Sequence, residues 1–193
     1  DTVHTIQNIN KIISASNKKG LEVIKKVYKN VTKKKLVITK SIKIAEAAKI
    51  IENTQRDINI ALMNELSMLF DKLNIDFEEI LKAANTKWNF LNFKPGLVGG
   101  HCIGVDPYYL AFEAKKKNFN TNIILSGRKT NEKMYKFVVN KFIFEINKKL
   151  NLNYKKKILI VGLTFKENVP DCRNSQNIKI VKYLKKKGFN VST

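Results

Sequence analysis

A run of seventeen residues, 94–110 (KPGLVGGHCIGVDPYYL), holds the residue types best suited to chemistry in this sequence. It contains four of the eight glycines and two of the three prolines, together with Cys102 and Asp106. Glycine permits positive φ and close approach of the backbone to a ligand, so we expect a shaped loop. Cysteine is a nucleophile once its thiolate is favoured, and a carboxylate four residues later can lie beside it if the backbone turns. The residues leave two interpretations open: a nucleophile with its carboxylate, or a structural cysteine buried in a glycine-rich turn.

The flanking sequence predicts helices that position this loop. Residues 41–93 contain neither Gly nor Pro, and their apolar residues recur at three- and four-residue steps, which predicts one long amphipathic helix over 42–73. Asp76 with Glu79 three residues later resembles a capping box for a second helix that ends near Ala84. Beyond the loop, we predict helices at about 107–118 and 128–149.

Short strands are predicted at both ends of the chain. The expected order is strand 11–16, helix 19–30 and strand 35–39 near the N-terminus, and strand 157–163, helix 174–187 and strand 189–192 near the C-terminus. Each set is a β-α-β unit, so the sequence predicts an α/β protein with a long-helix central α domain.

Composition excludes several classes of protein. With 44% hydrophobic residues the chain is expected to be globular, and no apolar run reaches the ~18 residues that a membrane span needs. The two cysteines, Cys102 and Cys172, lack the spacing of a disulfide framework or a metal site. We therefore expect free thiols, no metal, no membrane partner and a cytoplasmic location.

Three ordered motifs resemble one enzyme family. The glycine-rich loop, the segment AEAAKIIENTQRDINIALMNEL (45–66) and the segment GLTFKENVPDCRNS (162–175) are similar to the nucleotide-sugar 6-dehydrogenases, the UDP-glucose/GDP-mannose dehydrogenase family. Residues 86–110 most resemble the branch that acts on UDP-N-acetyl-hexosamines. The resemblance implies NAD-dependent oxidation of a UDP-sugar at carbon six to the uronic acid, for surface polysaccharide precursors. It also implies a homodimer formed through the long helix.

The resemblance assigns a catalytic set. Cys102 matches the cysteine that forms a thiohemiacetal and then a thioester with the sugar. Lys49 and Asn53, four apart and so on one helix face, match residues that reach the reacting oxygen. Asp106 matches an aspartate that assists proton transfer or positions water. Read without the motif, Lys49 is one of many solvated lysines and Asp106 a helix N-terminal carboxylate ahead of Pro107.

The resemblance also assigns contacts to the UDP-sugar. The expected residues are Asn89, Phe90, Phe93, Lys94, Gly96, Gly99, Gly100, Phe165 and Lys166. The last two are otherwise an ordinary loop after a buried strand, and Arg173 is a weaker candidate. His101 is expected to pack or hydrogen-bond, and Cys172 to be a small buried residue. Trp88 is either core or a stacking surface.

The fingerprint for a dinucleotide is absent from this sequence. No G-x-G-x-x-G follows a strand, so no residue is assigned to NAD. We therefore expect three parts: residues 1–40 as the end of an NAD-binding Rossmann-like domain, 41–150 as a central helical dimerisation and catalytic domain, and 154–193 as the truncated start of a UDP-sugar-binding Rossmann-like domain. Such a fragment is expected to be inactive alone. The alternative is a non-catalytic helical dimerisation or sugar-nucleotide-binding module.

The net charge of +21 raises the possibility of a nucleic-acid partner. Only Arg56, Arg128 and Arg173 are arginines, and the lysines are spread along the whole chain. No recognition helix, zinc finger or aromatic-interleaved motif is present. We therefore predict no nucleic-acid partner, and expect the positive field to attract an anionic sugar nucleotide and NAD.

Overall fold

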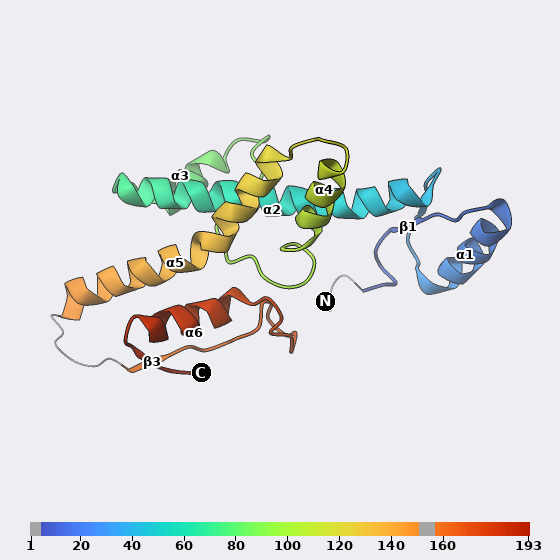
Figure 1. The fold of residues 1–193 in the computed structure, drawn as a ribbon. Coiled ribbons are helices and arrows are strands. Elements are labelled where there is room, and N and C mark those ends of the chain that lie inside the picture. Colours follow the sequence, from blue (N-terminus) through green and yellow to red (C-terminus); the bar gives the residue numbers. More distant parts are fainter. Residues whose placement is uncertain (1–4, 151–156) are drawn as a thin grey trace. The chain divides into compact units, whose positions relative to one another are not determined.

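The computed structural model describes residues 5–150 and 157–193, which form the helices and short strands of Figure 1. The chain divides into two compact units, Asp1–Glu52 and Asn53–Thr193. The predicted start of the third domain, residue 154, lies outside the described residues. The architecture is rich in helices with short strands at both ends, and the predicted fold class is confirmed.

The first unit contains a β-α-β arrangement. Strand β1 (Lys11–Ile13) and strand β2 (Leu36–Ile38) pair in parallel, and helix α1 (Lys18–Val31) connects them. Asn17 caps α1, because its side chain accepts a hydrogen bond from the backbone N–H of Gly20 at 2.8 Å. The predicted order is confirmed, although both strands are shorter than predicted.

Helix α2 (Ile42–Lys72) is the long helix predicted from the sequence. It begins in the first unit and continues into the second. Helix α3 (Phe77–Ala84) follows, with Asp76 as its N-cap. The capping box is only half formed: Asp76 accepts from the backbone of Glu78 and Glu79, whereas the Glu79 carboxylate pairs with Lys82 at 2.6 Å.

Helix α4 (Asp106–Lys115) starts inside the glycine-rich run, and helix α5 (Asn122–Leu150) crosses α2 (Figure 1). Helix α5 begins at Asn122, whereas the sequence predicted a start at residue 128. The reason is Gly127, which is not a helix break: a Cβ there would lie 3.4 Å from the Cβ of Ala61 on α2. The glycine lets the two helices approach closely.

The C-terminal part is a second β-α-β arrangement. Strands β3 (Lys157–Leu159) and β4 (Asn190–Ser192) pair in parallel around helix α6 (Gln176–Lys186). Helix α6 lies beside α5, and Val139, Leu184 and Val191 form a buried core between them. This packing joins residues 160–175, which follow β3, to the helical part of the second unit.

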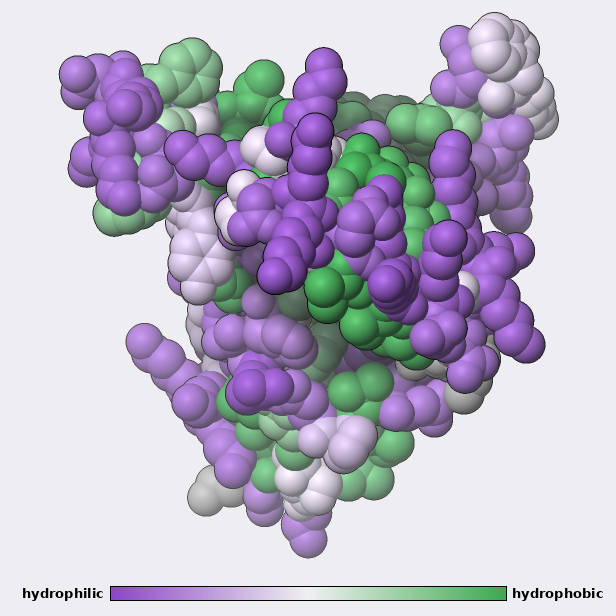
Figure 2. Space-filling view, turned by 90° about the vertical axis from the view of Figure 1, so that its right-hand side faces the viewer, coloured by the Kyte–Doolittle hydropathy of each residue, from purple (hydrophilic) through white to green (hydrophobic). Residues whose placement is uncertain are grey.

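Hydrophilic side chains cover most of the surface visible in Figure 2, with hydrophobic areas between them. No helix within the described residues combines the length and apolar character that a membrane span requires.

Candidate functional site

Cys102 is half-buried and lines a cavity of about 330 Å³ in the second unit. The other lining residues are Asn53, Arg56, Ile60, Leu97, Val98, Gly99, His101, Ile103, Phe165 and Lys166. Helix α2, the glycine-rich loop and the segment after β3 each contribute to this wall. The structure therefore brings five of the predicted site residues together: Cys102, Asn53, Gly99, Phe165 and Lys166.

A buried amide–carboxylate pair adjoins this cavity. Asn53 Nδ2 donates a hydrogen bond of 2.6 Å to Asp106 Oδ2, and the two residues are only 6% and 7% exposed. The backbone N–H of Asp106 donates to the carbonyl of Cys102 at 2.8 Å, so the carboxylate lies one helical turn beyond the thiol. Asp106 also begins α4, with Pro107 in the first turn, as its helix-terminal interpretation predicted.

Arg56 was not identified from the sequence. Its NH1 lies 3.4 Å from Asn53 Oδ1, and its side chain lines the Cys102 cavity. The available signal was its spacing, because a residue three positions after Asn53 lies on the same helix face. Arg56 and Lys166 place two cations on the wall of the thiol cavity.

Lys49 lies on α2 one turn before Asn53, in the first of the two units, and is exposed. Its predicted role at the reacting oxygen stays a prediction.

The segment between β3 and α6 packs against the nucleophile loop, which we define as residues 96–105. A Cβ on Gly99 would lie 2.9 Å from the carbonyl oxygen of Asn174, and one on Gly100 (φ 84°) would lie 2.8 Å from the Phe165 ring. Gln176 Nε2 donates to the carbonyl of Val98 at 3.0 Å. Only glycine fits at these two positions, and this close contact places Phe165 beside the thiol cavity.

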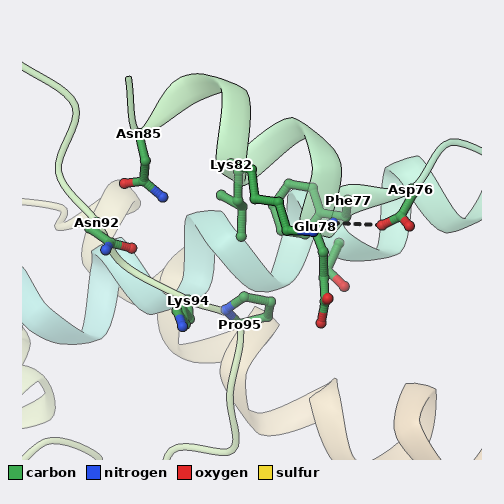
Figure 3. A pocket seen from close by; sticks show the side chains of 10 residues that line it. Asp76, Phe77, Glu78, Lys82, Asn85, Asn92, Lys94 and Pro95 are labelled. Atoms are coloured by element: carbon green, nitrogen blue, oxygen red, sulfur yellow. Dashed lines mark hydrogen bonds between the residues drawn. The ribbon is translucent and has the colours of Figure 1, made fainter. Parts of the chain in front are cut away.

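A second cavity, of about 500 Å³, lies between α3 and the start of the glycine-rich run. Figure 3 shows Asn92, Lys94 and Pro95 on the extended segment facing Lys82 and Asn85 of the helix region. This cavity contains Lys94 but not Cys102. Five further predicted substrate residues line neither cavity: Asn89, Phe90, Phe93, Gly96 and Gly100. The residues predicted to bind the sugar nucleotide therefore do not line one common cavity in this structure.

Behind the loop lies a buried polar network of four residues on α2 and α5: Asp57, Asn64, Arg128 and Asn131, each at most 3% exposed. Arg128 NH1 pairs with Asp57 Oδ1 at 2.6 Å, and Asn131 Nδ2 donates to the same oxygen at 2.7 Å. Burial raises the pKa of Asp57, and Arg128 and Asn131 oppose that shift. The sequence signal for this network was polar residues at helical spacing within apolar helix faces.

Polar residues of the adjoining loop meet at Asp171. His101 Nδ1 lies 3.8 Å from Asp171 Oδ2, and the His101 ring meets the Phe165 ring edge-on at 6.0 Å, as expected for a packing residue. Arg173 makes a two-pronged contact with Asp171 through NE and NH2, at 3.0 and 2.7 Å.

The exposure of two further residues, Cys172 and Trp88, decides between interpretations made from the sequence. Cys172 is exposed, on the loop between β3 and α6, so the prediction that it is buried was wrong. Trp88 is 95% exposed, which excludes the core interpretation.

The Arg173 contact yields a pH prediction. Hydrogen bonds from the Arg173 side chain and backbone hold the pKa of Asp171 at about 2, below its ordinary 3.8. A lowered carboxyl pKa stabilises the fold above about pH 4, and this contribution is lost as the pH falls towards 2. In Arg173→Leu, carbon-13 NMR titration of the Asp171 carboxyl is expected to show a midpoint near the ordinary value. His101→Phe is the control and should move the midpoint much less; equal midpoints in the parent and Arg173→Leu would contradict the assignment.

The glycine fingerprint of a dinucleotide site is not found in this sequence. The sequence has no G-x-G-x-x-G, and α1 begins with an Asn17 cap rather than a glycine turn. Among the described residues, no group of three or more His, Cys, Asp or Glu side chains is placed to hold a metal ion.

The sequence is similar to known nucleotide-sugar dehydrogenases. The family model for the UDP-glucose/GDP-mannose dehydrogenase family, central domain, matches residues 43–133, and the UDP binding domain model of that family matches residues 159–193. Protein CapL of Staphylococcus aureus is 52% identical over 192 residues, covering 100% of this chain and 45% of the relative. The UDP-N-acetyl-D-glucosamine 6-dehydrogenase of Salmonella typhi is 50% identical over 187 residues, covering 96% of this chain and 44% of the relative.

The fold of the chain is also similar to that of solved structures. The UDP-N-acetyl-mannosamine dehydrogenase from S. aureus superposes with a TM-score of 0.81 at 32% identity, covering 96% of this chain and 43% of that one. The chain thus spans less than half the length of the relatives that it matches.

Proposed function

Because the chain belongs to the UDP-glucose/GDP-mannose dehydrogenase family, we propose that it carries the thiol half of a UDP-sugar 6-dehydrogenase site. The complete reaction is oxidation of a UDP-sugar at carbon six to the uronic acid, with NAD as hydride acceptor. The substrate is a UDP-N-acetyl-hexosamine, because two relatives carry the names UDP-N-acetyl-D-glucosamine 6-dehydrogenase and UDP-N-acetyl-D-mannosamine dehydrogenase. The product serves as a precursor of surface polysaccharide.

One observation supports this function most strongly: a half-buried thiol lies one helical turn from a buried Asn53–Asp106 pair, in a cavity lined by two cations. A structural cysteine needs neither the paired carboxylate nor the cations.

The residues of this chain perform the steps at sulfur. Cys102 Sγ adds to the carbonyl carbon of the sugar aldehyde, and the tethered adduct cannot diffuse away. One amide N–H of Asn53 is held by Asp106, and the other is the donor for the developing oxyanion, with Lys49 as a second donor. After oxidation to the thioester, water attacks its carbonyl carbon, Asp106 takes the proton of the water, and the Cys102 thiolate leaves. The residues that hold NAD lie outside this set.

The remaining residues complete the proposed organisation. Residues 1–40 are the end of the NAD domain, 41–150 the central domain, and 154–193 the start of the UDP-sugar domain. Two copies of the protein form a homodimer through helix α2. Both thiols are free in the structure, which suits a reducing cytoplasm.

The proposed function predicts NADH formation by an extended protein that contains these 193 residues and covers the full length of its relatives. It is expected to oxidise UDP-N-acetyl-hexosamines in a panel of UDP-sugars, whereas the 193-residue chain alone releases no NADH. In the short chain, the same sugars are expected to slow alkylation of Cys102 and leave that of Cys172 unchanged. NADH formation by the short chain would contradict the proposal that it carries only the thiol half of the site.

The alternative, a non-catalytic helical dimerisation or sugar-nucleotide-binding module, makes a different prediction. Tight dimerisation, without NADH formation by the extended protein and without protection of Cys102, would favour the dimerisation module. Protection without turnover would favour the sugar-nucleotide-binding module.

A further inference from the structure

The nucleophile loop has no helix or strand of its own to hold it. No helix or strand is described between α3, which ends at Ala84, and α4, which begins at Asp106. Its backbone position therefore depends on side chains that reach it from other elements. Two such contacts come from the segment after β3, through Gln176 and Asn174. The others come from the buried polar network.

Asn64 holds the first residue of the loop by both backbone groups. Its Nδ2 donates to the carbonyl of Gly96 at 2.9 Å, and its Oδ1 accepts from the Gly96 N–H at 2.8 Å. The side chain thus pairs with the Gly96 backbone as a neighbouring β-strand would. Asn64 is 0% exposed, so water does not compete for these bonds.

The orientation of the Asn64 amide is itself determined. The second Nδ2 hydrogen donates to Asn131 Oδ1 at 2.8 Å, so both donors of Asn64 are used. Asn131 in turn donates to the backbone carbonyl and the carboxylate of Asp57, at 2.9 and 2.7 Å. Because Asn131 uses its nitrogen on Asp57, only its oxygen remains to face Asn64. The Asp57–Arg128 ion pair therefore fixes the orientation of the Asn131 amide. Through Asn131 it also fixes the orientation of the Asn64 amide, which binds Gly96.

The same arginine meets the far end of the loop. A Cβ on Gly104 would lie 3.7 Å from Arg128 NH2, and the Arg128 guanidinium lies 5.7 Å from the centre of the Tyr108 ring. The Tyr108 hydroxyl donates to Glu132 at 2.6 Å, and Arg128 NH2 approaches Glu132 at 3.7 Å. One network thus reaches Gly96 at the start of the loop and Gly104 near its end, with Cys102 between them.

We propose that Asn64 is a positioning residue, which, with Asn131 and the Asp57–Arg128 pair, holds the nucleophile loop so that Cys102 faces its cation-lined cavity. This inference rests on the proposed function for the role of the thiol. It goes beyond that function by assigning a positioning role to four residues that do not line the Cys102 cavity. A network that only filled the core would not need two hydrogen bonds to one loop residue, because apolar side chains of similar volume fill cores equally well.

The test is Asn64→Leu, which keeps the number and branching of the side-chain heavy atoms but removes both bonds to Gly96. Asn59→Leu, the same exchange on the same helix, is the matched control. In the 193-residue chain, Cys102 and Cys172 are alkylated with neutral iodoacetamide and with anionic iodoacetate, and the two peptides are quantified by mass spectrometry. The ratio of iodoacetate to iodoacetamide rates reports the local positive field and is largely insensitive to exposure. Cys172, on an exposed loop, serves as the internal reference.

In the parent chain and in Asn59→Leu, this ratio is expected to be about tenfold higher at Cys102 than at Cys172, as cation-lined sites attract anions. In Asn64→Leu, the two ratios should agree within about twofold. A ratio at Cys102 that Asn64→Leu leaves unchanged would overturn the positioning role while the proposed function stands. Equal ratios in the parent would count against the thiol site of the proposed function.

Two further measurements test the inference independently of alkylation. Hydrogen exchange at the Gly96 amide should accelerate at least about tenfold in Asn64→Leu, and this expectation does not depend on whether the chain is an enzyme. Unchanged exchange would overturn the inference. In the extended protein, kcat should fall about 100-fold while KM changes less than about threefold, since a small misplacement of a reacting group costs about that much. If Asn64→Leu does not fold, Asn64→Ala removes the same bonds to Gly96 with a smaller side chain, and is read in the same way.

Discussion

Cys102→Ser is expected to lower kcat for NADH formation by the extended protein by at least about a thousandfold. A serine hydroxyl is a much weaker nucleophile than a cysteine side chain near neutral pH, so addition to the sugar aldehyde is lost. The side chain changes by one atom, so the fold and the cavity are retained. The measurement is absorbance of NADH at saturating UDP-sugar, with kcat and KM determined separately.

Cys172→Ser is the matched control, because it makes the same exchange at the other free thiol. It should leave kcat within about twofold of the parent, since exposed substitutions away from a site have small effects. A Cys102→Ser protein with nearly full activity would show that no covalent intermediate forms at this residue. The reaction would then proceed through a free aldehyde, and the proposed role of Asp106 in hydrolysis of the thioester would fall with it.

Arg128→Met is expected to be the most destabilising of the substitutions considered. The side chain is 3% exposed and pairs with Asp57, which is 0% exposed, so removal of the cation leaves a buried carboxylate without its charge partner. Breaking a buried pair in this way costs about 3–5 kcal/mol. Asp57 Oδ2 already has no hydrogen-bond partner within the described part of the chain, so the remaining contacts offer little compensation. Urea unfolding followed by circular dichroism of the helices measures the loss.

Lys129→Met is the control, because it removes the adjacent, exposed cation of the same helix. It should change the unfolding free energy by less than about 0.5 kcal/mol. Arg128→Met combined with Asp57→Leu should recover part of the loss, since no charge is then buried alone. Equal unfolding midpoints for Arg128→Met and Lys129→Met would show that the buried pair does not stabilise the fold.

Local sequence determined most of the secondary structure. The absence of Gly and Pro over 41–93 and the three- and four-residue steps of apolar residues predicted α2 correctly, because helix periodicity is a property of neighbouring residues. The same is true of the Asp76 cap and of the two β-α-β arrangements. The start of α5 was missed because Gly127 is a helix breaker in isolation, and only its contact with Ala61 explains its place inside a helix.

The residues of the candidate site also fall into two groups: those that the sequence identified and those that it did not. Cys102 and Asp106 were identified from residue types and spacing, and Asn53 from the family resemblance. The structure pairs Asn53 with Asp106, which begins α4 one turn after Cys102. Arg56 and the buried network of Asp57, Asn64, Arg128 and Asn131 were not identified. Hydrogen bonds of the network join residues that are 32 to 74 positions apart in the chain, whereas Arg56 contacts Asn53 on its own helix.

Sequence alone therefore determined the helices, the short strands at both ends and the thiol with its carboxylate, since each depends on residues within a turn or two of one another. The tertiary structure decided which charges line the thiol cavity, which glycines are packed too closely for a side chain, and what holds the nucleophile loop. Those features depend on α2, α5 and the segment after β3 meeting in space, and no local pattern encodes which polar residues face each other when helices cross.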